Sequence, residues 1–220
     1  MTAPRGFLSS TIGLKIVMAV TGVILVGFIL GHMVGNMLLY RGPEAINAYG
    51  RELRELLHGS AIWIARGTLL AAVLLHIWSA WALTLKNRQA RPVAYKEWKA
   101  QDSTYASRTM RVSGLIILFF VIYHLMHLTI GNAHPNFVEG DVYHNVVAGF
   151  QVWWVAAFYI AAQLALGLHL YHGLWSMFQS LGLNHPRYNR WRNIFAQVFA
   201  LVVTLGNISF PVAVLTGWVS

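Results

Sequence analysis

Five stretches of this chain are long and apolar enough to cross a lipid bilayer, and no other feature restricts the fold as much. A helix needs about 20 apolar residues to cross a hydrocarbon core of about 30 Å. We place the predicted spans near residues 12–39, 61–85, 112–131, 149–179 and 194–219. The fold class predicted from this pattern is all-α, in a polytopic membrane protein.

The composition supports a chain that lies almost entirely in the membrane. Hydrophobic residues make up 57% of the 220 residues and charged residues only 10%, with a mean hydropathy of +0.54. A soluble domain would carry about a quarter charged residues. We therefore predict a single membrane-anchor domain over residues 1–220, surrounded by lipid, with no large soluble domain.

The charges are distributed unevenly between the predicted loops. The segments 86–111 and 180–193 are rich in Lys and Arg, whereas 132–148 holds Glu139 and Asp141 and no basic residue. Positive charge is retained on the cytoplasmic side of membrane proteins. The prediction is a multi-pass protein of the plasma or inner membrane, with its N-terminus cytoplasmic and its C-terminus outside. The net charge of +9 follows from these loops, and we expect no nucleic-acid partner.

Four of the predicted spans each carry a histidine deep in the apolar sequence: His32, His76, His124 and His169. An ionisable side chain inside a bilayer usually marks a function, because it is costly to bury. His32 and His124 lie about seven residues, or roughly 10 Å, from the outer ends of their helices. His76 and His169 lie about nine residues, or roughly 14 Å, from the inner ends. The four therefore form two layers, an outer pair and an inner pair, separated by about 16 Å in ~40 Å helices.

Two layers of paired imidazoles favour two bis-histidine b-type haems, held in a four-helix bundle with the fifth helix peripheral. The chain has no cysteine, so thiolate-held iron–sulfur clusters and covalently attached haem are excluded. Two axial imidazoles leave no open position on the iron, which favours electron transfer over oxygen chemistry. The competing interpretation is that each histidine only forms a hydrogen bond to a neighbouring helix.

Neighbouring polar residues leave several assignments open. His127 and His172 each follow a candidate ligand by three residues, so either member of each pair could bind iron; depth favours His124 and His169. His127 and His172 could instead bind haem propionates or a quinone. Other propionate candidates are Arg66 for the outer haem and Lys15 and Arg111 for the inner haem. The remaining histidines, at positions 58, 134, 144 and 185, are expected in solvated loops.

The ordered residues resemble the five-helix dihaem cytochrome b anchor of succinate:quinone oxidoreductases, including fumarate reductases. The resemblance covers most of residues 9–185. It rests on SSTIGLKIVMAVTG running into GHMVGNMLLYRGPEAINAYG, and on LLHIWSAWAL, RVSGLIILFFVIYHLMHL and GLHLYHGLWSMFQSLGLN. Carried over by motif, the axial ligands fall on His32, His76, His124 and His169, which selects His124 over His127 and His169 over His172.

The resemblance also implies a complex. A flavoprotein subunit would oxidise succinate, in the tricarboxylic acid cycle, and an iron–sulfur subunit would pass electrons to this anchor from the cytoplasmic face. The final acceptor would be a quinone, which in dihaem members is usually menaquinone. Alone, the chain has no predicted catalytic residue. A higher oligomer is compatible with the sequence and is not specified by it.

Two other functions remain as alternatives. The first is the cytochrome b subunit of another quinone-linked dehydrogenase, such as a hydrogenase or formate dehydrogenase. The second is a transporter that uses intramembrane histidines for protons or a metal, against which the sequence shows no inverted repeat of the kind that transporters often contain.

Overall fold

The computed structural model describes residues 6–90 and 105–220, and in this part of the chain it contains seven α-helices and no strand. A 3-10 segment, Met37–Arg41, extends the first helix, and a π-helical turn, Met126–Ile130, extends the fourth. The helices are α1 (Thr11–Asn36), α2 (Pro43–Glu55), α3 (Ser60–Gln89), α4 (Tyr105–Leu125), α5 (Val142–Gln151), α6 (Trp153–Ser180) and α7 (Pro186–Leu215).

Five of these segments are long and apolar enough to cross a membrane, which confirms the predicted all-α, polytopic class. They are Thr11–Arg41, Ser60–Gln89, Arg108–Ile130, Trp153–Ser180 and Pro186–Leu215. The first three agree with the predicted spans to within a few residues. Part of the predicted basic loop 86–111, including Arg91, Lys96 and Lys99, lies outside the described residues.

The fourth span begins at Trp153, four residues after its predicted start at residue 149. The helix is interrupted at Val152, which lies between α5 and α6 and has extended backbone angles of φ −80° and ψ 101°. Phe150 and Val155 are both buried in the same core. Five residues apart on one continuous helix, they would lie about 140° apart around its axis. The break lets both side chains reach the core, and apolar composition alone carries no sign of it.

The fifth span begins at Pro186 and ends at Leu215, rather than at the predicted 194 and 219. The side chain of His185 accepts a hydrogen bond from the backbone N–H of Arg187, and proline occupies the first helical position. Both features favour a helix start. At the other end Gly217 has a positive φ of 76°, the left-handed conformation that commonly terminates a helix. Local capping thus shifted the helix by several residues from the apolar run.

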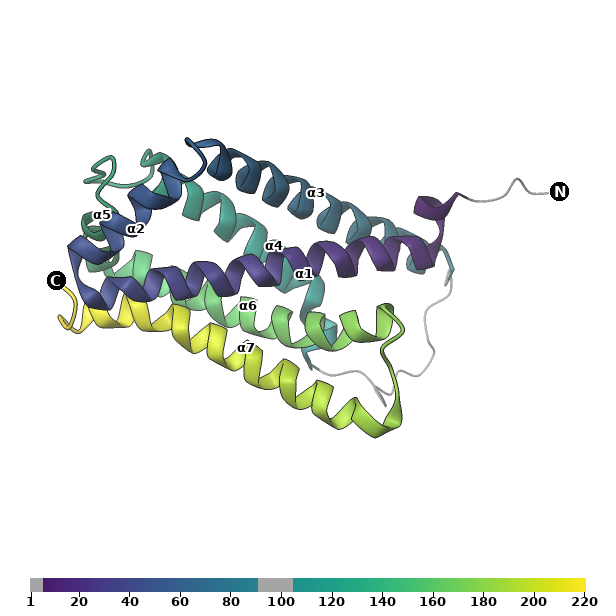
Figure 1. Cartoon of the computed structure of the whole chain (residues 1–220). Helices are drawn as coiled ribbons and strands as arrows, with labels where there is room; N and C mark the ends of the chain where they lie inside the picture. Colours follow the sequence, from purple (N-terminus) through teal and green to yellow (C-terminus); the bar gives the residue numbers. More distant parts are fainter. Residues whose placement is uncertain (1–5, 91–104) are drawn as a thin grey trace.

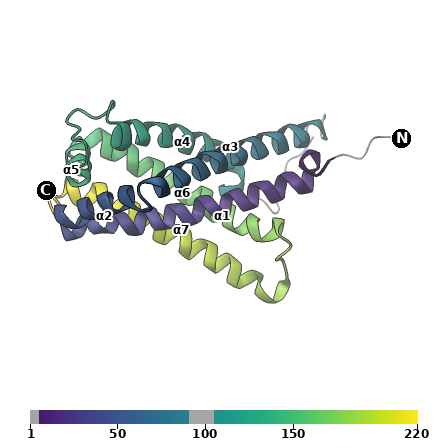
Figure 2. The same ribbon diagram turned by 45° about the horizontal axis from the view of Figure 1, so that its top comes forward.

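The long helices lie side by side, with α2 and α5 at one end of the bundle (Figures 1 and 2). Helix α1 packs along α3, α4 along α6, and α6 along α7, while α1 also contacts α6. The start of α1 and the C-terminus lie at opposite ends (Figure 1). The arrangement is therefore two helix pairs, α1–α3 and α4–α6, with α7 outside them.

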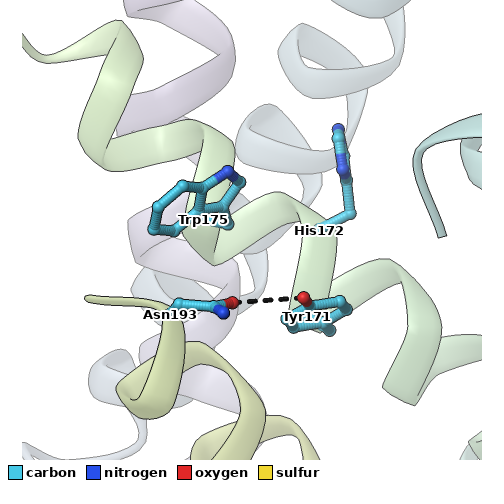
Figure 3. A pocket seen from close by; sticks show the side chains of 4 residues that line it. All are labelled: Tyr171, His172, Trp175 and Asn193. Atoms are coloured by element: carbon cyan, nitrogen blue, oxygen red, sulfur yellow. Dashed lines mark hydrogen bonds between the residues drawn. The ribbon is translucent and has the colours of Figure 1, made fainter. Parts of the chain in front are cut away.

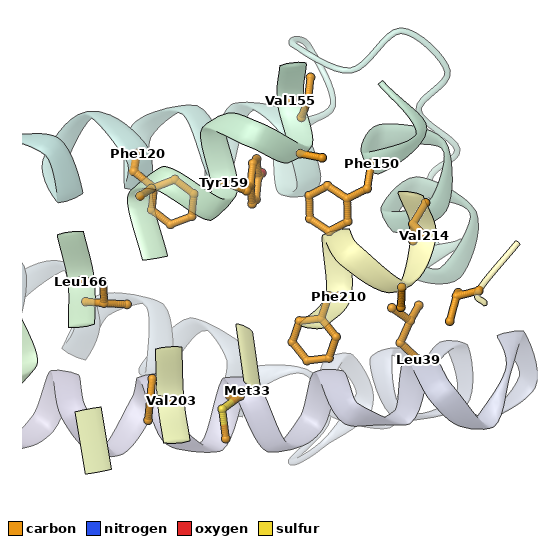
Figure 4. Packing of buried hydrophobic residues seen from close by; sticks show 14 of the residues in the cluster. Met33, Leu39, Phe120, Phe150, Val155, Tyr159, Leu166, Val203, Phe210 and Val214 are labelled. Atoms are coloured by element: carbon orange, nitrogen blue, oxygen red, sulfur yellow. The ribbon is translucent and has the colours of Figure 1, made fainter. Parts of the chain in front are cut away.

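The buried core is concentrated in the half of the bundle that lies near α2 and α5. It joins residues from α1, α4, α5, α6 and α7, and Figure 4 shows Tyr159 between Phe120 and Phe150 in this region. Large apolar side chains along the outer faces of the long helices are exposed, among them Leu70 and Leu205. Such surfaces are expected where lipid, rather than water, surrounds the helices.

The short helices α2 and α5 are joined by polar side chains. The Asn47 side chain donates to Asp141 Oδ1 at 2.9 Å, and its Oδ1 accepts from the Tyr143 backbone N–H at 3.0 Å. Asp141 also caps α5 by accepting from the His144 backbone N–H at 3.0 Å. These hydrogen bonds favour the carboxylate, so they lower the pKa of Asp141. The end of the bundle that carries the outer histidines is therefore closed by a hydrogen-bonded layer.

Candidate functional site: two pairs of histidines

The structure brings the four histidines together in two pairs, each made across the two helix pairs. His32 on α1 faces His124 on α4 with ring centroids 5.9 Å apart. His76 on α3 faces His169 on α6 with ring centroids 6.3 Å apart. In the described chain, neither α1 and α4 nor α3 and α6 belong to the closely packed helix pairs. The rings therefore approach each other from helices whose backbones stand apart.

This spacing suits a metal ion between each pair of rings. A metal–imidazole bond is about 2 Å long and the ring nitrogen lies about 1.1 Å from the ring centre. Two imidazoles on opposite sides of one metal therefore have centroids about 6.2 Å apart. The observed 5.9 and 6.3 Å lie close to this value. Each pair offers two axial ligands and leaves the perpendicular plane for other donors.

Both histidines of the inner pair have their Nδ1 atom held by a buried hydroxyl. Thr21 Oγ1 lies 3.1 Å from His76 Nδ1, and Ser113 Oγ lies 3.3 Å from His169 Nδ1. Each hydroxyl also donates to a backbone carbonyl one turn earlier on its own helix, for example that of Val17 at 2.8 Å. With its proton used in this way, the hydroxyl accepts from Nδ1–H. Nε2 is then left with the free lone pair that a metal requires.

A glycine follows each of these hydroxyl residues and lies next to the imidazole, where an added Cβ would be in ordinary van der Waals contact with the ring. A Cβ added at Gly22 would lie 3.6 Å from His76 Cε1, and one at Gly114 would lie 3.7 Å from His169 Cε1. The same pattern, Ser or Thr, then Gly, nine residues and His, occurs in α1 over 21–32 and in α4 over 113–124. At 1.5 Å per residue, the ten residues from glycine to histidine separate the two pairs by about 15 Å. The two helices thus present the same inner and outer contacts.

The outer pair is held by different groups. His124 Nδ1 lies 3.3 Å from the hydroxyl of Tyr159 on α6, and the same hydroxyl lies 3.0 Å from His127 Nδ1. The ring of His32 stacks on Phe28, one turn earlier on α1, with centroids 5.3 Å apart. The inner and outer pairs therefore differ in their hydrogen-bond acceptors.

His127 follows His124 by three positions and contacts the same Tyr159 hydroxyl, but the ring that faces His32 is that of His124. The helix changes to a π turn at Met126, where the backbone N–H of Gly131 bonds to the carbonyl of Met126 at 3.0 Å. A π turn contains more residues per turn, so each residue rotates less and the two side chains diverge. His127 is fully buried against His134 and Tyr123, away from His32.

His172 follows His169 by three residues on α6. It lines a pocket of about 170 Å³ with Tyr171, Trp175 and Asn193 (Figure 3). Tyr171 donates a hydrogen bond to Asn193 Oδ1 at 3.1 Å across the contact between α6 and α7. His172 therefore borders this pocket, whereas the ring that contacts His76 is that of His169.

The basic propionate candidates lie near the helix ends. Arg66 is exposed on α3 with its guanidinium carbon 4.9 Å from the centre of the Trp63 ring. Lys15 and Arg111 are exposed near the starts of α1 and α4. They precede Thr21 by six residues and Ser113 by two, at the end of the bundle where the inner pair lies. The structure shows no direct contact of these three residues with the histidine pairs.

The expectation that four histidines lie in solvated loops was wrong for His134. It also changes for His144 and His185, which belong to helix α5 and to the cap of helix α7. His134 is buried, because the loop after α4 folds inward; its Nε2 donates to the Asn145 carbonyl at 2.9 Å. The Asn145 side chain in turn bonds to both backbone groups of Val138. His144 lies in α5 and His185 caps α7, while His58 is exposed.

The hydroxyl and glycine contacts of the imidazoles were not predicted from the sequence. Thr21, Gly22, Ser113 and Gly114 could have been found from the pattern that α1 and α4 share. Tyr159 had no such signal, because it is one of two tyrosines in an apolar helix and its contact depends on how α6 packs against α4.

The geometry defines a class of protein: a multi-pass helical membrane protein with opposed histidines on four of its spans. Comparison with known proteins then gives the family. Residues 84–207 match the family described as the succinate dehydrogenase/fumarate reductase transmembrane subunit, and the chain belongs to this family.

One relative supports the same assignment over most of the chain. The succinate dehydrogenase cytochrome b558 subunit of Bacillus subtilis (strain 168) is 28% identical over 173 residues, which are 77% of this chain and 80% of the relative. No solved structure matches the chain. Family membership favours the succinate dehydrogenase hypothesis over the hydrogenase, formate dehydrogenase and transporter alternatives.

Proposed function

We propose that this chain is the dihaem cytochrome b anchor of a succinate:quinone oxidoreductase and carries electrons between the iron–sulfur subunit and a quinone. The observation that carries the proposal is the pairing of His32 with His124 and of His76 with His169 at the spacing that bis-imidazole ligation requires. The name of the Bacillus relative, a cytochrome b558, supports haem b as the group between the rings. When bound, haem supplies an iron that accepts and returns one electron at a time.

The protein's own residues would hold and isolate the two haems. Thr21 and Ser113 would orient the inner imidazoles and Tyr159 would orient His124, so that Nε2 of these three histidines is available to iron. Between the two levels, residues 22–31 of α1 contain only apolar side chains and glycine. This lining excludes water between the haems, and burial of this kind is one of the factors that set a haem potential. If both histidines of a pair bound the haem iron, no position would remain for oxygen, which favours electron transfer.

The distribution of charge supports a cytoplasmic N-terminus. Among the described residues, the charged side chains at the bundle end where α1 starts are all basic. They are Lys15, Lys86, Arg88, Arg108, Arg111, Arg187, Arg190 and Arg192. Every described acidic side chain lies between α1 and α3 or between α4 and α5. By the positive-inside rule the basic end faces the cytoplasm. An iron–sulfur subunit, with its flavoprotein partner, would dock there, beside the inner haem.

The quinone completes the electron path. Succinate oxidation on the flavoprotein releases electrons and protons, and a quinone, with menaquinone as our proposed species, takes up both to become a quinol. The quinone would receive its electrons through the two haems of this subunit.

A spectrum of the purified protein tests the proposal directly. The reduced-minus-oxidised difference spectrum should show a b-type α-band, and the haem content should be two per chain. His76→Ala should lose the inner haem and keep the outer, and His124→Ala should do the reverse. His127→Ala should keep both haems, and His185→Ala, an exposed histidine at the start of α7, is the matched control.

The results that would refute the proposal are equally clear. A colourless protein would remove the cytochrome function. An unchanged content of two haems in both His76→Ala and His124→Ala would show that other residues bind iron. Succinate-dependent haem reduction in the intact complex, lost when the partner subunits are removed, tests the proposed electron path separately.

A further inference from the structure

Tyr159 lies at the centre of a buried polar cluster beside the outer histidine pair. Its hydroxyl is shared by His124 Nδ1 at 3.3 Å and His127 Nδ1 at 3.0 Å. The Tyr159 ring is 5% exposed and packs edge-on against Phe120 and Phe150, with centroids 5.0 and 4.9 Å away (Figure 4). The hydroxyl is therefore held in place by the packing of its ring, because neither neighbour leaves room for it to rotate.

His127 is held as firmly as Tyr159. Its ring stacks between the rings of Tyr123 and His134, at centroid distances of 5.4 and 4.7 Å. Its edge rests on Gly149 of α5, where an added Cβ would lie 2.6 Å from His127 Cε1 and 2.9 Å from its Nε2. In the described chain His127 is fully buried and its Nε2 has no hydrogen-bond partner. The ring has no space in which to turn its Nε2 toward the bundle centre.

Binding of a metal by His124 would fix the direction of its hydrogen bond to Tyr159, and the Tyr159 proton is then available to His127. A ligand bound through Nε2 keeps its proton on Nδ1, so His124 donates to the Tyr159 oxygen. The single hydroxyl proton of Tyr159 is then donated to Nδ1 of His127. His127 carries its own proton on Nε2, the buried atom that faces Gly149. The reverse direction would place a proton on His124 Nε2 and block coordination.

We propose that Tyr159, locked by His127, is the positioning residue of the outer haem: it fixes the His124 tautomer and strengthens this imidazole as an iron ligand. The inference rests on the dihaem function proposed above. At the inner pair, the corresponding role belongs to Thr21 and Ser113. A hydroxyl that donates to one imidazole is a better acceptor for the other, because linked hydrogen bonds polarise each other.

Removal of one oxygen atom tests the proposal. Tyr159→Phe deletes the hydroxyl and keeps the ring, and Tyr123→Phe is the matched control. Tyr123 belongs to the same aromatic cluster, and its hydroxyl is buried without a partner among the described residues. Both variants are prepared as the full complex in its membrane. The readouts are haem content, the potential of each haem by redox titration, and the low-temperature electron paramagnetic resonance signal of each ferric haem.

In Tyr159→Phe the outer haem should become easier to reduce. We expect about a threefold higher ratio of reduced to oxidised haem at fixed potential, a shift of about 28 mV, with an altered outer ferric signal. The inner haem, and both haems in Tyr123→Phe, should keep the wild-type values. Selective loss of the outer haem in Tyr159→Phe, with two haems in Tyr123→Phe, would also support the proposal.

A second variant reaches the same cluster without changing a hydrogen-bonding group. Gly149→Ala must displace the His127 ring and so should shift the outer haem in the same direction as Tyr159→Phe. Gly173→Ala, on α6 with nothing within 4 Å of the added Cβ, is its control. An outer haem unchanged in both Tyr159→Phe and Gly149→Ala would overturn the proposal. A wild-type complex without haem would instead refute the proposed function.

Discussion

The contact between Thr21 and His76 permits a quantitative prediction about the inner haem. Thr21 is 5% exposed, and its hydroxyl accepts from the imidazole Nδ1 while donating to the backbone carbonyl of Val17. Thr21→Val keeps the branched shape of the side chain and removes the hydroxyl, and with it both the acceptor for His76 and the side-chain bond to the Val17 carbonyl. The backbone hydrogen bonds of the helix remain.

The expected shift follows from the strength of one buried hydrogen bond. A net value of about 0.5–1.5 kcal/mol is typical, and a ligand with stronger electron donation favours ferric iron. If about 0.5–1 kcal/mol of this bond distinguishes the two oxidation states, the inner potential rises by about 20–40 mV, since 59 mV corresponds to a tenfold change for one electron. Ser113→Ala, at the partner imidazole, should give a rise of similar size.

An optical redox titration of the purified complex measures both haem potentials in one experiment. The matched control is Thr84→Val, which removes a half-buried hydroxyl that donates to the Ala80 carbonyl on α3. The shifts of Thr21→Val and Ser113→Ala should add in the double variant, because each acts on a different ligand. An unchanged inner potential, or a shift confined to the outer haem, would refute the reasoning.

Three further variants test other parts of the structure through thermal unfolding in detergent. Gly167→Ala should lower the free energy of unfolding by about 1–3 kcal/mol, because the new Cβ collides with Thr204 on α7. Gly173→Ala on the same helix should be neutral or slightly stabilising. Equal stabilities of the two variants would contradict the packing of α6 on α7. Asp141→Asn should be less stable than wild type near pH 7, and the difference in stability should shrink as the pH falls below about 4. The reason is that the lowered pKa of Asp141 gives stability that is lost when the carboxylate is protonated. A difference in stability that is independent of pH would exclude the carboxylate as its cause. Arg192→Met should lower the melting temperature, because Arg192 donates to two asparagine side chains and the Trp175 carbonyl at the turn between α6 and α7; an unchanged value would show that these bonds do not hold the turn.

The helical class and the first three spans could be read from the sequence because apolar length alone specifies a helix that crosses a bilayer. The starts of the last two spans could not. The break at Val152 depends on Phe150 and Val155 reaching one core, and the start of α7 depends on the cap at His185. Hydropathy does not detect such local features as a helix break or a helix cap, because it averages composition over a window of many residues.

The choice of histidines shows the same division. The depth of His124 in its helix predicted a partner at the level of His32, because the rise of a helix is fixed. The sequence alone treated His127 as a near-equivalent neighbour on one face. Only the structure contains the π turn that separates them and the Gly149 surface that buries His127.

The sequence by itself determined that this chain crosses the membrane as helices and carries one deep histidine on each of four spans. Periodicity and rise along a single helix fix these properties. The tertiary structure decided which atoms hold each imidazole: Thr21 and Ser113 for the inner pair and Tyr159 for His124. Those contacts join different helices, and the angle and register at which helices pack depend on every side chain between them.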